Sequence, residues 1–292
     1  MHSITVKAYA KINLGLDVLR KRPDGYHDVC MIMQSLDLKD IISIHRKEEK
    51  GITIRTNLSY LPSNQDNLVY KAAELFLQNI GVEDGLAITL EKNIPVAAGL
   101  AGGSSDAAAT LIGLNKLYQA GMSLEQLQEL GVKLGADVPY CLMLGTALSE
   151  GIGEVLTPLT PMPSCSILLV KPDISVSTRY VYENLQLNEL SVHPDIEAMI
   201  FALADRDIYT LTKTMDNILQ SVTVKEYPII AEIKDKMKEL GALTSLMSGS
   251  GPTVFGIYQN RDNAKKALAY FKKHQHFGKQ AFLTTPYWPK AE

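Results

Sequence analysis

The chain has 292 residues, of which 46% are hydrophobic, and this is enough for roughly two domains that each bury a core. Its formal net charge of −3 at pH 7 argues against broad nucleic-acid binding, which needs a basic face. The three cysteines are far apart, and neither a signal peptide nor a membrane-length apolar run is seen, so we expect a cytoplasmic protein without disulfides, a zinc site or a membrane partner.

Alternation of apolar and polar residues predicts several strands in the first half of the chain. Ile4, Val6 and Ala8 begin the first one, and others are expected over residues 12–19, 29–38, 41–46, 51–56 and 86–91. Gly81 stands where a glycine commonly ends a helix, which predicts a helix over residues 66–80. A helix rich in small residues is expected over 104–118, and a capping box at Ser123 predicts another that ends at Leu134.

The second half mixes the two kinds of element. A strand over residues 147–150 lies near the expected junction between an N-terminal domain, residues 1–150, and a C-terminal domain, residues 151–292. Further strands are predicted over 166–171, 243–247, 253–258 and 280–284, and helices over 195–203, 207–215, 226–240 and 260–273. Because strands and helices do not alternate strictly along the chain, the pattern favours an α+β fold over a doubly wound sheet.

The most informative segment of the sequence is rich in glycine and serine and leads directly into a predicted helix. Its glycines permit close approach of a ligand, and the helix start offers N–H groups and a positive dipole end to an anion. Ser104 and Ser105 are expected to cap the helix. The spacing is that of neither a Walker A loop nor a Rossmann fingerprint. We interpret the segment as a phosphate loop; the alternative is a flexible loop before a buried helix. It comprises Pro95, Val96, Ala97, Ala98, Gly99, Leu100, Ala101, Gly102, Gly103, Ser104 and Ser105.

Three further features are ambiguous when each is taken alone. Lys11 and Asn13 share one face of a predicted strand, but a solvated lysine is the ordinary interpretation of Lys11. Asp137, in the run Gly135–Pro139, has the position of a helix-capping aspartate. The segment Ser248–Pro252 is compatible with an ordinary hairpin turn.

Taken together, these segments resemble, in the same order, the motifs of the GHMP kinases, a family that includes galactokinase, homoserine kinase and mevalonate kinase. The resemblance implies a two-domain α+β fold, with an N-terminal half related to ribosomal protein S5 domain 2 and a smaller C-terminal half. The chain departs from the family at Asp106, where some members have Asn, and at Ala97, Ala98 and Ala101, where some have glycine. None of these changes removes a backbone N–H group.

The resemblance also implies the nucleotide site and the catalytic residues. ATP is expected as the phosphoryl donor, with its triphosphate on the phosphate loop and its adenosine near Asn67, Leu68 and Lys92. Mg²⁺ is expected to bridge phosphate oxygens, with Ser104 or Ser105 as a contact and no dedicated metal site of protein residues. Asp137 would accept the proton of the attacking hydroxyl, with Lys11 as its partner. Gly249, Ser250 and Gly251 would support the site.

In detail, the segment from Lys11 to His27 resembles one branch of the family, whose acceptor is a methylerythritol linked to cytidine diphosphate. The resemblance implies phosphorylation of its 2-hydroxyl in the non-mevalonate route to isoprenoids. Asn13, Tyr26, His27, Thr178 and Tyr182 would line the acceptor pocket; the family often has Phe at the last position, and either ring can stack on a base.

Two alternatives remain open at this point. The same fold serves homoserine and mevalonate-type kinases, whose acceptors lack a nucleobase and would not need Tyr26 and His27. A non-catalytic relative is the other alternative, but it would be expected to have lost Lys11 or Asp137. Either a monomer or a homodimer is compatible with the sequence.

Overall fold

The computed structural model describes residues 2–187 and 192–289, which form two compact units. The first unit comprises the described residues up to Ala10, Leu38–Val96 and Ala101–Met143, and the second comprises Lys11–Asp37, Ala97–Leu100 and the described residues from Leu144 onward. The predicted domain boundary after residue 150 stays a prediction, because these compact units are not continuous in the sequence. Two long strands, β1 (Ser3–Lys21) and β2 (His27–Lys47), each contribute residues to both units.

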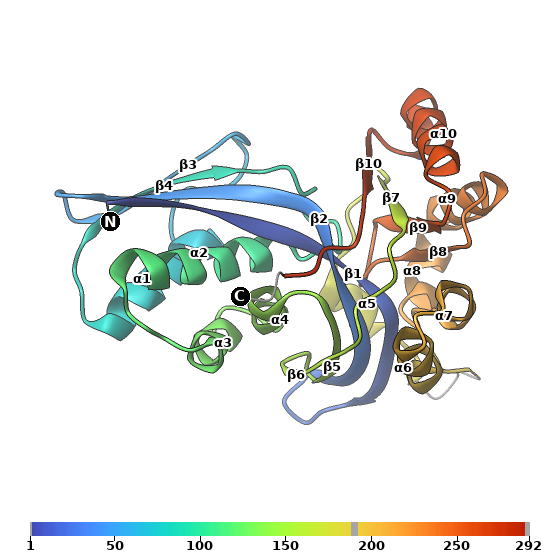
Figure 1. Cartoon of the computed structure of the whole chain (residues 1–292), viewed down its shortest axis with the longest axis horizontal. Coiled ribbons are helices and arrows are strands. Elements are labelled where there is room, and N and C mark those ends of the chain that lie inside the picture. Colours follow the sequence, from blue (N-terminus) through green and yellow to red (C-terminus); the bar gives the residue numbers. More distant parts are fainter. Residues whose placement is uncertain (1, 188–191, 290–292) are drawn as a thin grey trace. The chain divides into compact units, whose positions relative to one another are not determined.

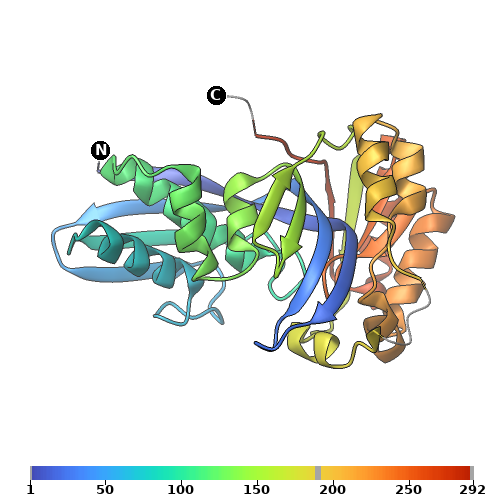
Figure 2. The same ribbon diagram turned by 90° about the horizontal axis from the view of Figure 1, so that it is seen from below.

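The first unit is a sheet with helices on one face (Figure 1). The end of β2 pairs antiparallel with β4 (Gly85–Glu91), which pairs parallel with β3 (Gly51–Thr56). Four helices cover this sheet, as Figure 2 shows from the helix side. They are α1 (Leu68–Ile80), α2 (Gly102–Tyr118), α3 (Leu124–Val132) and α4 (Val138–Met143).

Helix α2 is largely buried, and its first half consists mainly of small residues. A Cβ atom added to Gly113 would lie 3.0 Å from Cδ1 of Ile44 on β2, so helix and sheet approach closely. Helix α1 packs on α2 and buries Val69, Phe76 and Leu77, which recur at helical spacing. The burial of these faces gives the helices the stability that short isolated helices lack.

The second unit contains a four-stranded antiparallel sheet in the order β10–β7–β9–β8. These strands are β7 (Ser166–Lys171), β8 (Thr244–Met247), β9 (Val254–Tyr258) and β10 (Gln280–Thr284). Helices α9 (Ile229–Glu239) and α10 (Arg261–Lys273) pack on this sheet (Figure 1). The start of β2 pairs with β5 (Thr146–Gly151), which pairs with β6 (Val155–Pro158).

Shorter helices complete the second unit. They are α5 (Thr178–Glu183), α6 (Ile196–Ala204), α7 (Ile208–Thr214), α8 (Gln220–Glu226) and a 3₁₀ turn, η2 (Gln275–Phe277). Gly15 on β1 allows α6 to approach, since a Cβ atom there would lie 2.7 Å from the sulfur of Met199. In the described part of the chain, no helix combines the length and the apolar character needed to cross a lipid bilayer.

The structure agrees with the predicted strands over residues 51–56, 166–171 and 280–284 at both ends. It differs at β1 and at β2, each of which is one long strand where the sequence predicts two shorter ones. The alternation of apolar and polar residues is interrupted in these strands by Lys11, Asn13 and Asp40, which are buried in the fold. The prediction missed the strand β6, which has four residues, and the helices α4, α5 and α8, whose six or seven residues make fewer than two helical turns and show little of a helical period. The helix predicted over 226–240 begins at Ile229, after Pro228.

The capping box of α3 provides a test of local stability. The Ser123 hydroxyl accepts from the Gln126 N–H at 3.3 Å, and the Gln126 side chain accepts from the Ser123 N–H at 2.9 Å. We expect Ser123→Ala to lower the free energy of unfolding by about 1 kcal/mol, measured by urea denaturation, because it leaves a helix N–H group without its acceptor. Ser123→Asp retains an acceptor and should lose less than half as much. Equal losses in the two variants would contradict the capping role.

Candidate active site

The phosphate loop, residues 95–105, has an unusual backbone. Ala97, Gly99 and Ala101 all have positive φ angles, of 51°, 73° and 53°. Ala101 precedes the first residue of α2, and no side chain caps that helix end. The first-turn N–H groups of α2 are therefore not taken by a capping side chain, as an anion site requires.

The prediction that Ser104 or Ser105 caps this helix is wrong. Helix α2 begins at Gly102, so both serines lie within its first turn. The hydroxyl of Ser105 is buried and donates to the carbonyl of Tyr9 at 2.7 Å, which ties the helix to β1. Ser104 is half-buried.

Lys92 lies in a buried ionic cluster that closes the base of the phosphate loop. Its ammonium group, with a side chain only 4% exposed, bonds Asp40 and, at 2.6 Å, Asp106. Asp40 also accepts from the backbone N–H groups of Asn93 and Ile94, the latter at 2.8 Å. Ile94 directly precedes the phosphate loop and Asp106 directly follows it. The cluster therefore holds both ends of the loop.

The charges in this cluster perturb one another. Burial raises the pKa of Asp106 well above its ordinary value; the charge of Lys92 opposes this effect, and that of Asp40 adds to it. Burial alone would lower the pKa of Lys92, but the charges of Asp106 and Asp40 outweigh it and leave the pKa raised. Within residues 2–187 and 192–289, Oδ1 of Asp106 is a buried atom without a hydrogen-bond partner. Asp40 was missed by the sequence analysis because nothing in its neighbourhood in the sequence marks it.

The residues predicted to bind adenosine lie near the start of α2. A Cβ atom on Gly102 would lie 3.3 Å from Nζ of Lys92, and one on Gly103 would lie 3.3 Å from Cδ1 of Leu68. Asn67 caps α1 by accepting from Val69 N–H at 2.9 Å and donates to the Pro62 carbonyl at 2.8 Å. The fold of the first unit thus brings Leu68 and Lys92 beside the phosphate loop, and gives Asn67 a structural role as well.

Lys11 is buried, which excludes the interpretation of a solvated strand lysine. It is 5% exposed, and its ammonium group donates to Oδ1 of Asn13 at 2.9 Å. Its backbone N–H donates to the carbonyl of Leu100, in the phosphate loop, at 3.1 Å. Asp137 belongs to the first unit, is half-buried and directly precedes α4. The pairing of Lys11 with Asp137 stays a prediction, since the two residues belong to different units.

The aromatic residues predicted for the acceptor pocket are partly brought together. The rings of His27 and Tyr182 lie 5.2 Å apart between centroids, while Tyr26 is 59% exposed. Burial and the charge of Lys21 lower the pKa of His27. Its imidazole is therefore neutral at pH 7 and offers one donor and one acceptor nitrogen. Thr178 contacts Ser250 through a hydroxyl pair at 2.8 Å.

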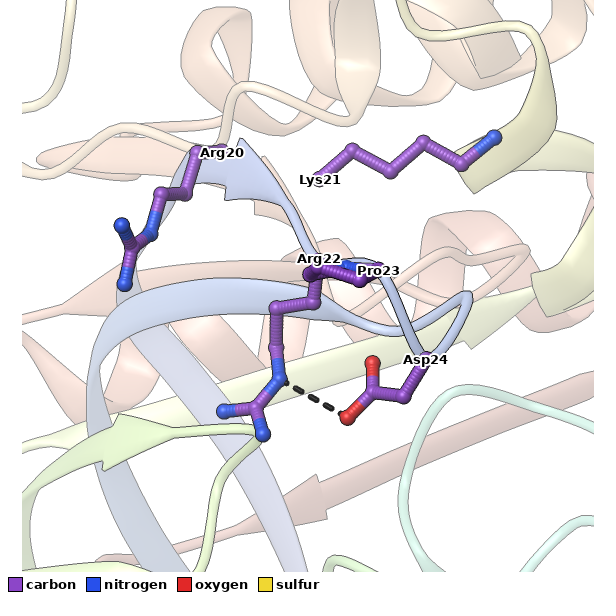
Figure 3. Close-up of a pocket in the computed structure, with 5 residues that line it drawn as sticks. All are labelled: Arg20, Lys21, Arg22, Pro23 and Asp24. Carbon is purple, nitrogen blue, oxygen red and sulfur yellow. Dashed lines mark hydrogen bonds and ion pairs between the residues drawn. The ribbon is translucent and has the colours of Figure 1, made fainter.

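A basic pocket lies at the end of β1, just before Tyr26 and His27 in the sequence (Figure 3). It has a volume of about 370 Å³ and is lined by Arg20, Lys21, Arg22, Pro23 and Asp24. Arg22 bonds Asp24 at 3.0 Å and Asp28 at 3.1 Å, and Arg20 also bonds Asp28. Lys21 extends away from the Arg22–Asp24 pair in Figure 3 and adds an exposed positive charge. No motif in the sequence predicts a role for this charge.

Among the residues that the structure describes, no group of three or more His, Cys, Asp or Glu side chains is arranged to bind a metal ion. A metal ion at this site would therefore need oxygen ligands from a bound substrate and from water.

The perturbed carboxyl group predicts a pH dependence of stability. The pKa of Asp106 is higher in the folded protein than its ordinary value of 3.8. The protonated carboxyl group therefore contributes fully to the free energy of unfolding below pH 3.8, and this contribution is lost as the pH rises through the pKa of the folded state. The amide of the Asp106→Asn variant can donate to Asp40 and does not ionise. We therefore expect its free energy of unfolding to fall less with rising pH than that of the parent, and to be no lower than that of the parent at pH 7. Urea denaturation at several pH values between 4.5 and 8 measures this free energy.

Asp40→Asn is the matched comparison. This variant weakens the acceptor for Lys92 and for two backbone N–H groups, and we expect it to cost about 3–5 kcal/mol. A similar loss for Asp106→Asn at pH 7 would show that the charge of Asp106 is required.

Comparisons with known proteins find two matching family models and several full-length relatives. Residues 67–145 match the family model described as GHMP kinases N terminal domain, and residues 199–276 match GHMP kinases C terminal. A 4-diphosphocytidyl-2-C-methyl-D-erythritol kinase from Lachnoclostridium phytofermentans is 57% identical over 97% of each chain. One from Lachnospira eligens is 48% identical over 99% of this chain and 100% of its own.

Solved structures resemble the chain over most of its length. A crystal structure of 4-(cytidine 5'-diphospho)-2C-methyl-D-erythritol kinase has a TM-score of 0.83 and 34% identity, covering 97% of this chain and 99% of its own. A homoserine kinase from Cytophaga hutchinsonii has a TM-score of 0.80 at 20% identity, covering 98% and 95%, and shows a shared fold. The two matching family models and the full-length relatives lead to one conclusion: this chain belongs to the GHMP kinase family.

Proposed function

We propose that this kinase transfers the γ-phosphoryl group of ATP to the 2-hydroxyl of 4-diphosphocytidyl-2-C-methyl-D-erythritol, a step of the non-mevalonate route to isoprenoid precursors. The observation that carries the proposal is the His27–Tyr182 pair, in a chain with full-length relatives named for this activity. A cytoplasmic location suits the three cysteines, which are not joined by disulfides.

The nucleotide would bind along the phosphate loop. Backbone N–H groups at the start of α2 would receive the phosphates, and Leu68 would contact the adenosine beside Gly103. The ammonium group of Lys92 is bound by two carboxylates. Lys92 would therefore contact the adenosine while it stays paired with Asp40 and Asp106.

A magnesium ion fits this site through the chemistry of its donors. Mg²⁺ prefers oxygen ligands and keeps several waters, so one hydroxyl and the phosphates are enough. Ser105 is 1% exposed and its hydroxyl donates to Tyr9, whereas Ser104 is half-buried, so Ser104 is the more accessible contact for the ion. Bound there, the ion would neutralise charge on the phosphates.

Catalysis would depend on positioning rather than on a protein nucleophile. Asp137 would accept the hydroxyl proton as the phosphoryl group transfers. Asn13 holds the ammonium group of Lys11 at 2.9 Å, which supports a fixed orientation for that charge. In this proposal Lys11 keeps Asp137 ionised and orients the attacking oxygen.

The acceptor pocket would recognise cytidine by its ring and its polar edge. Tyr182 and Tyr26 offer aromatic faces to the base, and a neutral His27 can donate to it or accept from it. Lys21 would attract the diphosphate of the acceptor from the basic pocket.

The direct test is ADP release by the purified protein with Mg-ATP and three acceptors: the cytidyl compound, homoserine and mevalonate. We expect turnover only with the cytidyl compound. Turnover with either small alcohol would replace the proposed acceptor and the roles of Tyr26, His27 and Tyr182. Binding of ATP without turnover of any acceptor would favour a non-catalytic relative.

The proposed base, Asp137, gives one prediction about the proposed function. Asp137→Asn keeps the shape of the side chain but cannot accept the proton, so we expect it to abolish phosphoryl transfer. Affinity for ATP, measured by calorimetry, should stay within a few-fold of the parent, because the carboxylate does not hold the nucleotide in this proposal. A near-normal kcat for this variant would contradict the role of Asp137 as base.

The ring of Tyr182, which we propose to stack on the cytosine base, gives a second prediction about the proposed function. Tyr182→Phe retains the aromatic face and should keep kcat/KM for the cytidyl acceptor within about threefold. Tyr182→Ala removes it, and we expect KM for this acceptor to rise about ten- to hundredfold, because base stacking contributes about 1–3 kcal/mol. The KM for ATP should not change. Equal behaviour of the two variants would show that the ring does not stack on the base.

A further inference from the structure

The segment Ser248–Pro252, here called the serine–glycine loop, is held firmly from one side. Asn217 is 1% exposed, and its amide donates to the carbonyls of Met247 and Gly249, each at 2.8 Å. The hydroxyl of Thr223 lies 3.3 Å from the carbonyl of Ser250 and 3.2 Å from the carbonyl of Leu219, and its single proton is shared between these two acceptors. Asn217 therefore provides the main support of the loop from this side.

The same loop contacts the phosphate loop. The hydroxyl of Ser248 donates to the carbonyl of Gly99 at 2.8 Å, and the N–H of Thr253 donates to the carbonyl of Ala98 at 3.3 Å. A Cβ atom on Gly99 would lie 2.3 Å from the carbonyl oxygen of Ser248, so the two backbones are in close contact. A displacement of one loop therefore has to be followed by the other.

At its other side the loop contacts the proposed acceptor pocket. The hydroxyls of Ser250 and Thr178 lie 2.8 Å apart, and either can be the donor. Each hydroxyl has a single proton. If Thr178 donates to a bound acceptor, Ser250 must donate to Thr178, and both hydroxyls take one orientation. Binding in the acceptor pocket would thus fix the contact that leads to the serine–glycine loop.

We propose that Ser250 is a positioning residue that couples the acceptor pocket to the nucleotide affinity of the phosphate loop. This inference rests on the proposed function, which assigns the two sites. The coupling runs from Thr178 through Ser250 and Ser248 to Gly99, all within the second unit. It is reciprocal: acceptor strengthens nucleotide binding by the same factor as nucleotide strengthens acceptor binding.

The experiment measures the Kd of ADP by calorimetry, with and without saturating cytidyl acceptor, a pair that cannot react. We expect the acceptor to tighten ADP binding by about five- to tenfold, the range of a modest coupling between sites. Ser250→Ala should reduce this factor to near one. Ser250→Thr retains the hydroxyl and should preserve it. Thr178→Val should also abolish the coupling, and the double variant should lose nothing further.

Ser245→Ala is the matched control. Ser245 is 2% exposed and donates to the carbonyl of Lys234 at 2.8 Å, so this variant also removes one buried hydroxyl from the sheet that carries the loop. It should retain the full coupling factor. Circular dichroism checks that each variant is folded, and Thr178→Val still tests the inference if Ser250→Ala does not fold.

The outcomes separate this inference from the proposed function. Unchanged coupling in Ser250→Ala, or a factor of one in the parent protein, overturns the inference, even if the cytidyl acceptor is phosphorylated normally. If another acceptor is turned over in its place, the proposed function is wrong. The coupling is then measured with that acceptor, and its loss in Ser250→Ala supports the inference independently.

Discussion

The buried contact of Lys92 with Asp40 and Asp106 is the constraint on which the rest of the candidate site depends. It joins β2, the residues after β4 and the first turns of α2, and so brings together the two ends of the phosphate loop. Burying three ionisable groups is costly, and such clusters stabilise a fold only when each charge is matched. Two carboxylates face one ammonium group, and the raised pKa of Asp106 relieves the imbalance. The cluster therefore serves geometry more than stability.

Between these fixed ends, the phosphate loop takes its shape from its backbone. Positive φ angles at Ala97, Gly99 and Ala101 turn the chain so that α2 begins without a capping side chain. Alanine adopts such angles at a cost that glycine avoids, so the loop keeps a strained backbone that its surroundings must hold. The serine–glycine loop supplies that support, since Gly99 has room only for hydrogen against Ser248. Asn217 in turn holds the serine–glycine loop.

Much of this arrangement could be predicted from local patterns, and some could not. The capping box at Ser123 and the end of α1 at Gly81 involve neighbours within a few residues, so their chemistry is visible in the sequence. Lys11 was ambiguous because a strand lysine can face water or the core, and only packing decides which. Asp40 and Asn217 gave no signal, because Asp40 acts on Asn93 and Ile94, and Asn217 on Met247 and Gly249, far away along the chain.

The amino-acid sequence by itself determined the family, the order of its motifs and most of the regular elements, because these depend on residue types at short spacing. Only the tertiary structure decided that β1 and β2 run unbroken through both units, that Ser105 binds Tyr9 instead of capping α2, and that Lys92 lies between two carboxylates. The physical reason is the same in each case. A buried polar group must find a partner, and which partner it finds is settled by the packing of elements distant in the sequence.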